Sequence, residues 1–223
     1  MILYHGSQEI VEKPAYGYGN RHNDYGRGFY CTENIELAGE WSSREDRDGY
    51  VNVYELNLQD LTVLNLNDDG FGVLNWLTVL LENRIFSLGS PMAKDAKKYL
   101  TENFTIEYNS FDIIKGYRAD DSYFAFAQDF LNGTISVRKL AEAMKLGRLG
   151  EQIVLKSPEA YDAIRYVDAL KTDSGIYYPK RMKRDKEARR TYLDNRKEGG
   201  NYTDVYMLDI LREEIKADDP RLR

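Results

Sequence analysis

Two segments near the start of the chain carry residue types that could hold a flat, polar, cationic heterocycle. The first reads Tyr4-His5-Gly6-Ser7 after an apolar lead-in, and the second reads Gly26-Arg27-Gly28-Phe29-Tyr30-Cys31. An imidazole supplies a hydrogen-bonding group, a glycine lets the backbone approach a ligand, and an aromatic face attracts a cationic ring. The pair of segments therefore predicts a binding site, although a histidine at a strand end and a tyrosine within a strand also occur without one.

Strands and helices must position these segments. We expect strands at residues 1–4, 51–56, 61–64, 112–116, 152–155 and 161–170, the last of which is also compatible with a helix. Helices are expected at residues 34–43, with Asn34 as N-cap, and at residues 72–86, 91–100, 122–131 and 136–146. A further helix is expected around Val205, Leu208, Leu211 and Ile215, and residues 8–24 predict a long loop. Strands at both ends with helices between them indicate an α+β fold.

The composition is that of a globular protein. Hydrophobic residues make up 42% and charged residues 30% of the 223 residues, and no apolar run approaches the roughly 20 residues that a membrane helix needs. No signal peptide is visible, and the single cysteine, Cys31, cannot form an internal disulfide, so we expect a cytoplasmic protein without a membrane partner. Two histidines and one cysteine leave little material for a zinc site, and no metal is expected.

A basic stretch near the C-terminus contrasts with the overall net charge of −6. Its cationic residues are Lys180, Arg181, Lys183, Arg184, Lys186, Arg189, Arg190, Arg196 and Lys197. A solvated helix face is the favoured interpretation, and contact with phosphates or an acidic partner is the alternative. The predicted organisation is a core at residues 1–172, with a helical insertion at about 70–148, followed by a basic helical extension at residues 173–223.

The two N-terminal segments, together with Glu151-Gln152-Ile153-Val154, resemble the ADP-ribosyltransferase superfamily. They look most like its diphtheria-toxin and poly(ADP-ribose) polymerase branch, which is named for a His-Tyr-Glu triad. In that branch a first strand ends in His-Gly-Ser or His-Gly-Thr, a second motif reads Gly-x-Gly-Ile/Leu-Tyr-Phe, and a late strand begins with glutamate. Residues 116–124 are also similar to an uncharacterised bacterial family of transferase-like proteins. The resemblance implies a split, mixed β-sheet core of ADP-ribosyltransferase type with inserted helices and a helical tail.

The resemblance implies an enzyme that cleaves the nicotinamide–ribose bond of NAD and transfers ADP-ribose to a protein or nucleic-acid acceptor. In this scheme His5 bonds a ribose hydroxyl, Tyr30 and Trp41 sandwich the nicotinamide, and Gly6 faces the carboxamide. Glu151 stabilises the positive charge that develops on the ribose. The other expected ligand-binding residues are Ser7, Arg27 and Gly28. The resemblance also implies toxin–antitoxin or phage-defence biology, with a small neutralising partner protein.

Two departures from the family pattern leave alternatives open. Ala38 stands where the polymerases carry a serine that bonds the nicotinamide amide, and Gln152 rather than an aromatic residue follows Glu151. Because neighbours on a strand face opposite sides, one of Glu151 and Gln152 is expected to face the site, and both are candidate catalytic positions. Trp41 also fits an apolar helix stripe. The alternatives to a transferase are an NAD hydrolase, a non-catalytic NAD or ADP-ribose sensor, and a structural partner with a filled pocket.

Overall fold

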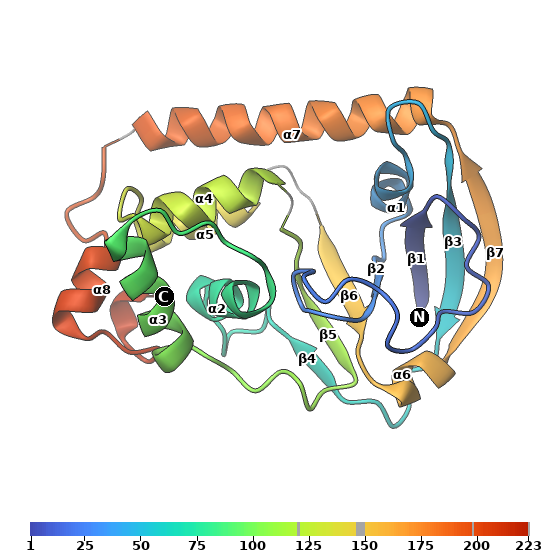
Figure 1. The fold of residues 1–223 in the computed structure, drawn as a ribbon, viewed down its shortest axis with the longest axis horizontal. Coiled ribbons are helices and arrows are strands. Elements are labelled where there is room, and N and C mark those ends of the chain that lie inside the picture. The colour runs from blue at the N-terminus through green and yellow to red at the C-terminus, as the bar shows by residue number, and fades with distance from the viewer. Residues whose placement is uncertain (120, 146–149, 198, 223) are drawn as a thin grey trace.

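The strands form two sheets that pack against each other, with helices beyond the second sheet (Figure 1). The computed structural model describes residues 1–119, 121–145, 150–197 and 199–222. The first sheet is antiparallel, has the order β1-β3-β7, and consists of Ile2–Ser7, Gly49–Leu56 and Ile164–Thr172. The structure is of the α+β class, and the strand alternative for residues 161–170 is correct from Ile164 on, whereas residues 161 and 162 end a short helix.

The second sheet carries the second N-terminal segment. Its order is β2-β6-β5-β4, and its strands span Phe29–Cys31, Glu151–Leu155, Ile113–Tyr117 and Val63–Asn65. Strand β4 runs parallel to β5, and the other pairs are antiparallel. Tyr4 and Thr32 exchange two backbone hydrogen bonds of 2.8 and 2.9 Å, which join the middle of β1 to the residue that follows β2. This bridge places the two N-terminal segments side by side.

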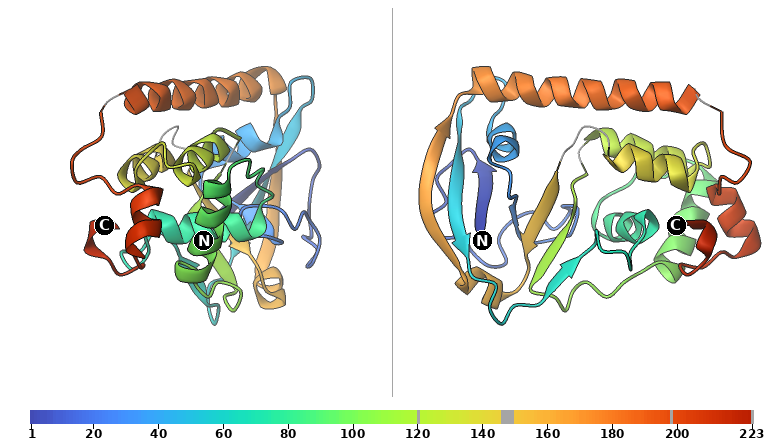
Figure 2. Two further views of the ribbon diagram at one scale, coloured as in Figure 1. Left: turned by 60° about the vertical axis from the view of Figure 1, so that its left-hand side comes forward. Right: turned by 180° about the vertical axis from the view of Figure 1, so that it is seen from behind.

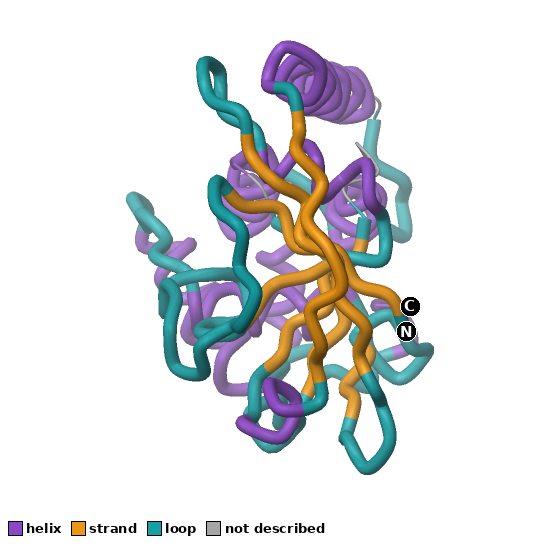
Figure 3. Tube along the Cα trace, turned by 90° about the vertical axis from the view of Figure 1, so that its right-hand side faces the viewer, coloured by secondary structure: helices purple, strands orange, loops and turns teal. Residues whose placement is uncertain are grey.

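Apolar side chains from both sheets fill the space between them. Leu3 from β1 and Tyr54 from β3 belong to the same buried cluster as Phe29, Cys31 and Ile153 of the second sheet. Figure 3, which looks from the β7 side, shows the strands of the two sheets one behind the other, with α7 at the top and seen nearly end-on. Burial of this apolar surface holds the two sheets together.

The opposite face of the second sheet is covered by helices. Their bounds are Val73–Asn83 for α2, Pro91–Asn103 for α3, Asp121–Leu131 for α4, Val137–Lys145 for α5 and Met207–Glu213 for α8. The main buried cluster joins Ile114 and Val154 of the sheet to Trp76 and Leu77 of α2 and Phe126 of α4. These helices arise within the expected insertion and tail, so most residues of the larger buried cluster come from those segments.

Short helices near the sheets begin at side-chain caps. In α1 (Ile35–Ser42), the Asn34 side chain accepts hydrogen bonds from the backbone N–H groups of Glu36 and Leu37, as its predicted N-cap role requires. In α6 (Pro158–Asp162), Ser157 accepts from the Ala160 N–H at 3.1 Å. The caps fix where each helix starts, and α1 starts directly after β2.

The buried faces of two short helices, α8 and α1, differ from the apolar spacing in the sequence. Leu208 is 40% exposed, whereas Met207 and Ile210 are buried in α8. In α1, Ile35 is 38% exposed, because this helix buries Leu37 and Ala38 against β1 and β3. Short helices have few apolar positions, so the sequence pattern alone does not define which face of the helix is buried.

The basic stretch lies on α7 (Ser174–Lys197), a long helix that continues directly from β7. Both views of Figure 2 show α7 across the molecule, from the first sheet to the helical end. It packs on α1 at one end and on α4 and α5 at the other. Within the described residues, no helix is both long and apolar enough to cross a lipid bilayer.

Candidate functional site

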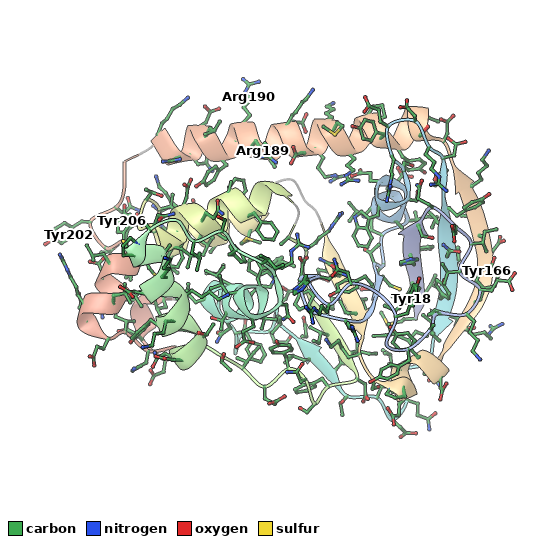
Figure 4. The ribbon with its side chains drawn as sticks, viewed as in Figure 1. Tyr18, Tyr166, Arg189, Arg190, Tyr202 and Tyr206 are labelled. Carbon is green, nitrogen blue, oxygen red and sulfur yellow. The ribbon has the colours of Figure 1, made fainter. Side chains whose placement is uncertain are left out.

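A cavity of about 730 Å³ opens where β1, β2 and β6 meet. Its lining includes His5 of β1, Tyr30 of β2 and Gln152 of β6, three positions far apart in the sequence. The expected loop at residues 8–24 lies over this place and contributes Tyr18 to the lining; Figure 4 labels this side chain. The volume is in the range of ordinary small-molecule sites.

His5 is held as a neutral imidazole. Its Nδ1 lies 2.7 Å from the backbone carbonyl oxygen of Tyr30, and because that oxygen only accepts, Nδ1 carries the proton. Burial lowers the pKa of His5, which the hydrogen bond to Tyr30 only partly offsets. The ring also packs on Phe29, with 4.4 Å between ring centroids. The Nε2 atom is therefore a hydrogen-bond acceptor that can receive a ligand hydroxyl.

Tyr30 holds the glycine turn that precedes it. Its hydroxyl donates to the Gly26 carbonyl at 2.6 Å and accepts from the Tyr25 N–H at 3.1 Å. Gly26 has a φ of +73°, which glycine adopts without strain. Burial raises the pKa of Tyr30, so the phenol stays protonated. The hydroxyl is thus used within the protein, and the ring is the part available to a ligand.

Gly6 and Gly28 border the cavity, but their missing side chains are needed by the fold itself. A Cβ on Gly6 would lie 2.0 Å from the Ala38 carbonyl oxygen and 2.9 Å from Trp41 Cβ. A Cβ on Gly28 would lie 2.5 Å from Val154 Cγ1. The close approach of α1 to β1 therefore requires glycine at position 6 whether or not a ligand contacts its backbone. Ala38 is fully buried under this contact and is not among the lining residues.

Trp41 lines the cavity from α1. The Arg118 guanidinium carbon lies 4.6 Å from the centroid of its ring, at cation–π distance. Its indole Nε1 is buried and lacks a hydrogen-bond partner among the described residues. The position fits the expected aromatic platform, and stacking of a nicotinamide between Tyr30 and Trp41 stays a prediction.

Ser7 and Arg27, which were expected on the ligand side, do not line the cavity. The Ser7 hydroxyl donates to the Glu9 carbonyl and accepts from Asn52 Nδ2 at 2.9 Å. Arg27 points into solvent. Fully buried Asn52, which the sequence analysis did not single out, also bonds the His5 and Glu9 carbonyls and accepts from the Val11 N–H. The Ser7 hydroxyl therefore helps to hold the loop at residues 8–24 in place and does not face the cavity.

Of the two candidate positions on β6, the structure brings Gln152 to the cavity and not Glu151. Gln152 is 4% exposed, whereas the Glu151 side chain is 41% exposed on the other side of the strand. Glu151 lies 2.8 Å from Lys115 Nζ and accepts a hydrogen bond from Asn67. The physical reason is the alternation of a strand, because neighbouring side chains leave opposite faces of the sheet.

The carboxylate in the cavity belongs to Asp24, which is not among the candidates from the sequence. Asp24 is 5% exposed, and its Oδ2 accepts from Gln152 Nε2 at 2.8 Å and from the Ala119 N–H at 2.9 Å. Its Oδ1 lies 3.6 Å from Arg84 Nη1 and lacks a hydrogen-bond partner among the described residues. Burial raises the pKa of Asp24, which these hydrogen bonds and charges partly counteract. No motif surrounds Asp24 in its loop, so only the tertiary structure could reveal it.

Positive charge predominates around the cavity. Among the described residues that line it, Asp24 is the only acid, and the cations are Lys13, Arg84, Arg118 and Arg181. Aromatic faces, a neutral histidine and several cations together suit a ligand that has a flat ring, hydroxyls and phosphates.

Comparison with known proteins gives one family. No curated protein and no solved structure matches the chain significantly. Residues 1–166, which include both N-terminal segments, β6 and part of β7, match the family model described as "Protein of unknown function (DUF3990)". The match covers well over half of the chain, and the protein therefore belongs to this family.

Proposed function

We propose that the cavity binds NAD, cleaves its nicotinamide–ribose bond and transfers ADP-ribose to a macromolecular acceptor. The observation that carries the proposal is the convergence of His5, Tyr30 and Gln152 on one cavity, since these positions come from the three segments that resemble ADP-ribosyltransferases. The split arrangement of two sheets is compatible with a core of that type. Toxin–antitoxin or phage-defence biology, with a small neutralising partner, stays a prediction from the resemblance.

The chemistry requires a group that stabilises positive charge. The C1′–N bond breaks, nicotinamide leaves with the bonding electron pair, and an acceptor nucleophile forms the new bond to C1′ and loses its proton. Charge that develops on the ribose is stabilised by a carboxylate already in place. Glu151 points away from the cavity and is bound to Lys115, so we assign this role to Asp24.

His5 and Gln152 complete the ribose site in this proposal. The neutral imidazole offers Nε2 as an acceptor. The Gln152 amide nitrogen is directed to Asp24, which leaves its Oε1 to accept a second ribose hydroxyl. His5 Nε2 and Gln152 Oε1, as hydrogen-bond acceptors, and the Asp24 carboxylate surround the ribose. Together they orient C1′ toward the attacking nucleophile, which is the positioning that catalysis needs.

The test uses two isosteric substitutions. Purified protein is incubated with NAD and cell lysate, and released nicotinamide and labelled acceptors are measured. Asp24→Asn is expected to reduce the rate by roughly 10²–10³, as loss of one preorganised charge-stabilising group does. Glu151→Gln is the matched control and should stay close to the wild type. No nicotinamide release and no labelling by the wild type would refute the proposal.

Stability is a necessary companion measurement. Because burial raises the pKa of Asp24, charging this carboxyl is less favourable in the folded protein than in the unfolded chain, so its contribution to stability falls as pH rises through that pKa. Asp24→Asn is therefore expected not to lower the free energy of unfolding at neutral pH, although Arg84 loses its partner. A folded but inactive variant separates loss of chemistry from loss of structure.

A second function, binding of NAD or ADP-ribose without turnover, is favoured by one observation. The position on β6 that faces the cavity carries an amide, Gln152, whereas the ADP-ribosyltransferases that the chain resembles have a catalytic glutamate on this strand. Calorimetry that shows ADP-ribose binding, together with no nicotinamide release, would select this sensor function. Mass spectrometry of the lysate distinguishes a transferase from an NAD hydrolase by the modified acceptors.

A further inference from the structure

Helix α7 lies beyond the residues that match the family, yet it borders the cavity. The family model ends at residue 166, and α7 begins at Ser174. Arg181, on its first half, is one of the lining residues. A segment outside the family match therefore contributes a charged group to the candidate site.

The first half of α7 is fastened to α1, the helix that carries Trp41. The Lys180 ammonium lies 2.8 Å from Glu36, and the Arg184 guanidinium makes a two-pronged contact of 2.7 and 3.0 Å with Glu40. The Glu40 side chain is only 4% exposed. Such a forked, charge-assisted pair fixes orientation as well as distance.

An aromatic contact adds to these ion pairs. A Cβ on Gly39 would lie 2.3 Å from Cε1 of Tyr177, so the ring packs directly on the backbone of α1. Contacts at Tyr177, Lys180 and Arg184 flank Arg181 on both sides along the helix. The position of its side chain at the cavity thus follows from rigid packing on α1.

Arg181 differs from its neighbours in its partners. Lys180 and Arg184 pair with acids, whereas the half-buried Arg181 makes no ion pair with the described residues. Removing a guanidinium partly from water without a counter-charge is unfavourable, and an anionic ligand would supply that charge. Arg84 lines the same cavity and already has the Asp24 carboxylate at 3.6 Å.

We propose that Arg181 binds a phosphate group of the ligand, so that α7 completes the site and selects phosphorylated nucleotides over uncharged nucleosides. The identity of that phosphate as the pyrophosphate of NAD rests on the proposed function. The phosphate-binding role itself rests on the placement of Arg181 and on the cationic lining. Guanidinium groups bind phosphate through paired charge-assisted hydrogen bonds, which gives the residue both affinity and geometric selectivity.

The test compares two arginines of the same helix. Arg190 is exposed and points away from the rest of the chain (Figure 4), so Arg190→Gln controls for net charge. Calorimetry on the full chain measures dissociation constants for ADP-ribose, ADP and adenosine. Arg181→Gln is expected to weaken ADP-ribose and ADP binding by about 10- to 100-fold, the worth of a hydrogen bond between charged groups, and to leave adenosine binding unchanged. Arg181→Lys should recover part of the loss.

The outcomes separate this inference from the proposed function. Equal ADP-ribose affinity in Arg181→Gln and Arg190→Gln would overturn the inference, as would failure of the wild type to bind either phosphorylated probe. An equal loss for adenosine would also overturn it, because that result indicates a general disturbance of the cavity. If ADP binding depends on Arg181 but NAD is not cleaved, the inference stands and the proposed reaction fails.

Discussion

Gly6→Ala tests how the cavity is built. The added Cβ would lie 2.0 Å from the Ala38 carbonyl oxygen, about 1.4 Å short of the 3.4 Å at which ordinary contact begins. It would also meet Ser42 N at 2.8 Å and Trp41 Cβ at 2.9 Å. These neighbours are mostly backbone atoms of α1, which cannot rotate aside, so the helix itself must retreat from β1.

The magnitude follows from that displacement. Overpacking of this kind costs typically 1–3 kcal/mol, and because three contacts fall below 3.0 Å we expect about 3 kcal/mol of lost unfolding free energy. Trp41 moves with α1, and a shift of about 1 Å in a positioning group can reduce activity roughly 10²-fold. Stability and ligand binding should therefore fall together.

Urea denaturation without ligand, followed by tryptophan fluorescence, measures the first effect, and calorimetry with ADP-ribose measures the second. Gly70→Ala is the control, because nothing lies within 4 Å of the Cβ it would add. This control should be neutral or stabilise by up to about 1 kcal/mol. If Gly6→Ala keeps wild-type stability and loses only ligand binding, the packing argument is wrong and the glycine serves the ligand alone.

Two further predictions concern groups that hold the site. Asn52→Ala removes four hydrogen bonds of 2.8–3.3 Å, which join Asn52 to the carbonyls of His5 and Glu9, the Ser7 hydroxyl and the Val11 N–H. The free energy of unfolding should therefore fall by about 2–4 kcal/mol. If the loop at residues 8–24 resists proteolysis as well as in the wild type, this prediction is wrong. Because burial lowers the pKa of His5 below the usual 6.5, the unfolded chain binds the proton first, and stability should fall as pH drops below about 6.5. His5→Gln should flatten this dependence in urea titrations at pH 7.5, 6.5 and 5.5, and an unchanged slope would refute the assignment of a buried neutral imidazole.

Local sequence patterns predicted most of the elements near the site. Strand β3 forms where it is expected, Asn34 caps α1, and the run of residues 8–24 forms the loop over the cavity. Each of these features depends on residues close together in the chain, through side-chain periodicity, capping or turn preference. His5 and Tyr30 could be named as candidates from their residue types and segments, and Trp41 from the family resemblance, before their spatial relation was known.

The sequence also determined that only one of Glu151 and Gln152 could face a shared site, because a strand alternates. Which one does so depends on how β6 is placed between β2 and β5, and pairing between distant strands decides that placement. The roles of Asp24 and Arg181 depend even more clearly on contacts between distant parts of the chain. Asp24 acquires its role only when Gln152 and Ala119 donate to it, and Arg181 reaches the cavity only because α7 is clamped to α1. Contacts between residues so far apart leave no local pattern, so the tertiary structure alone decided which carboxylate and which cations surround the cavity.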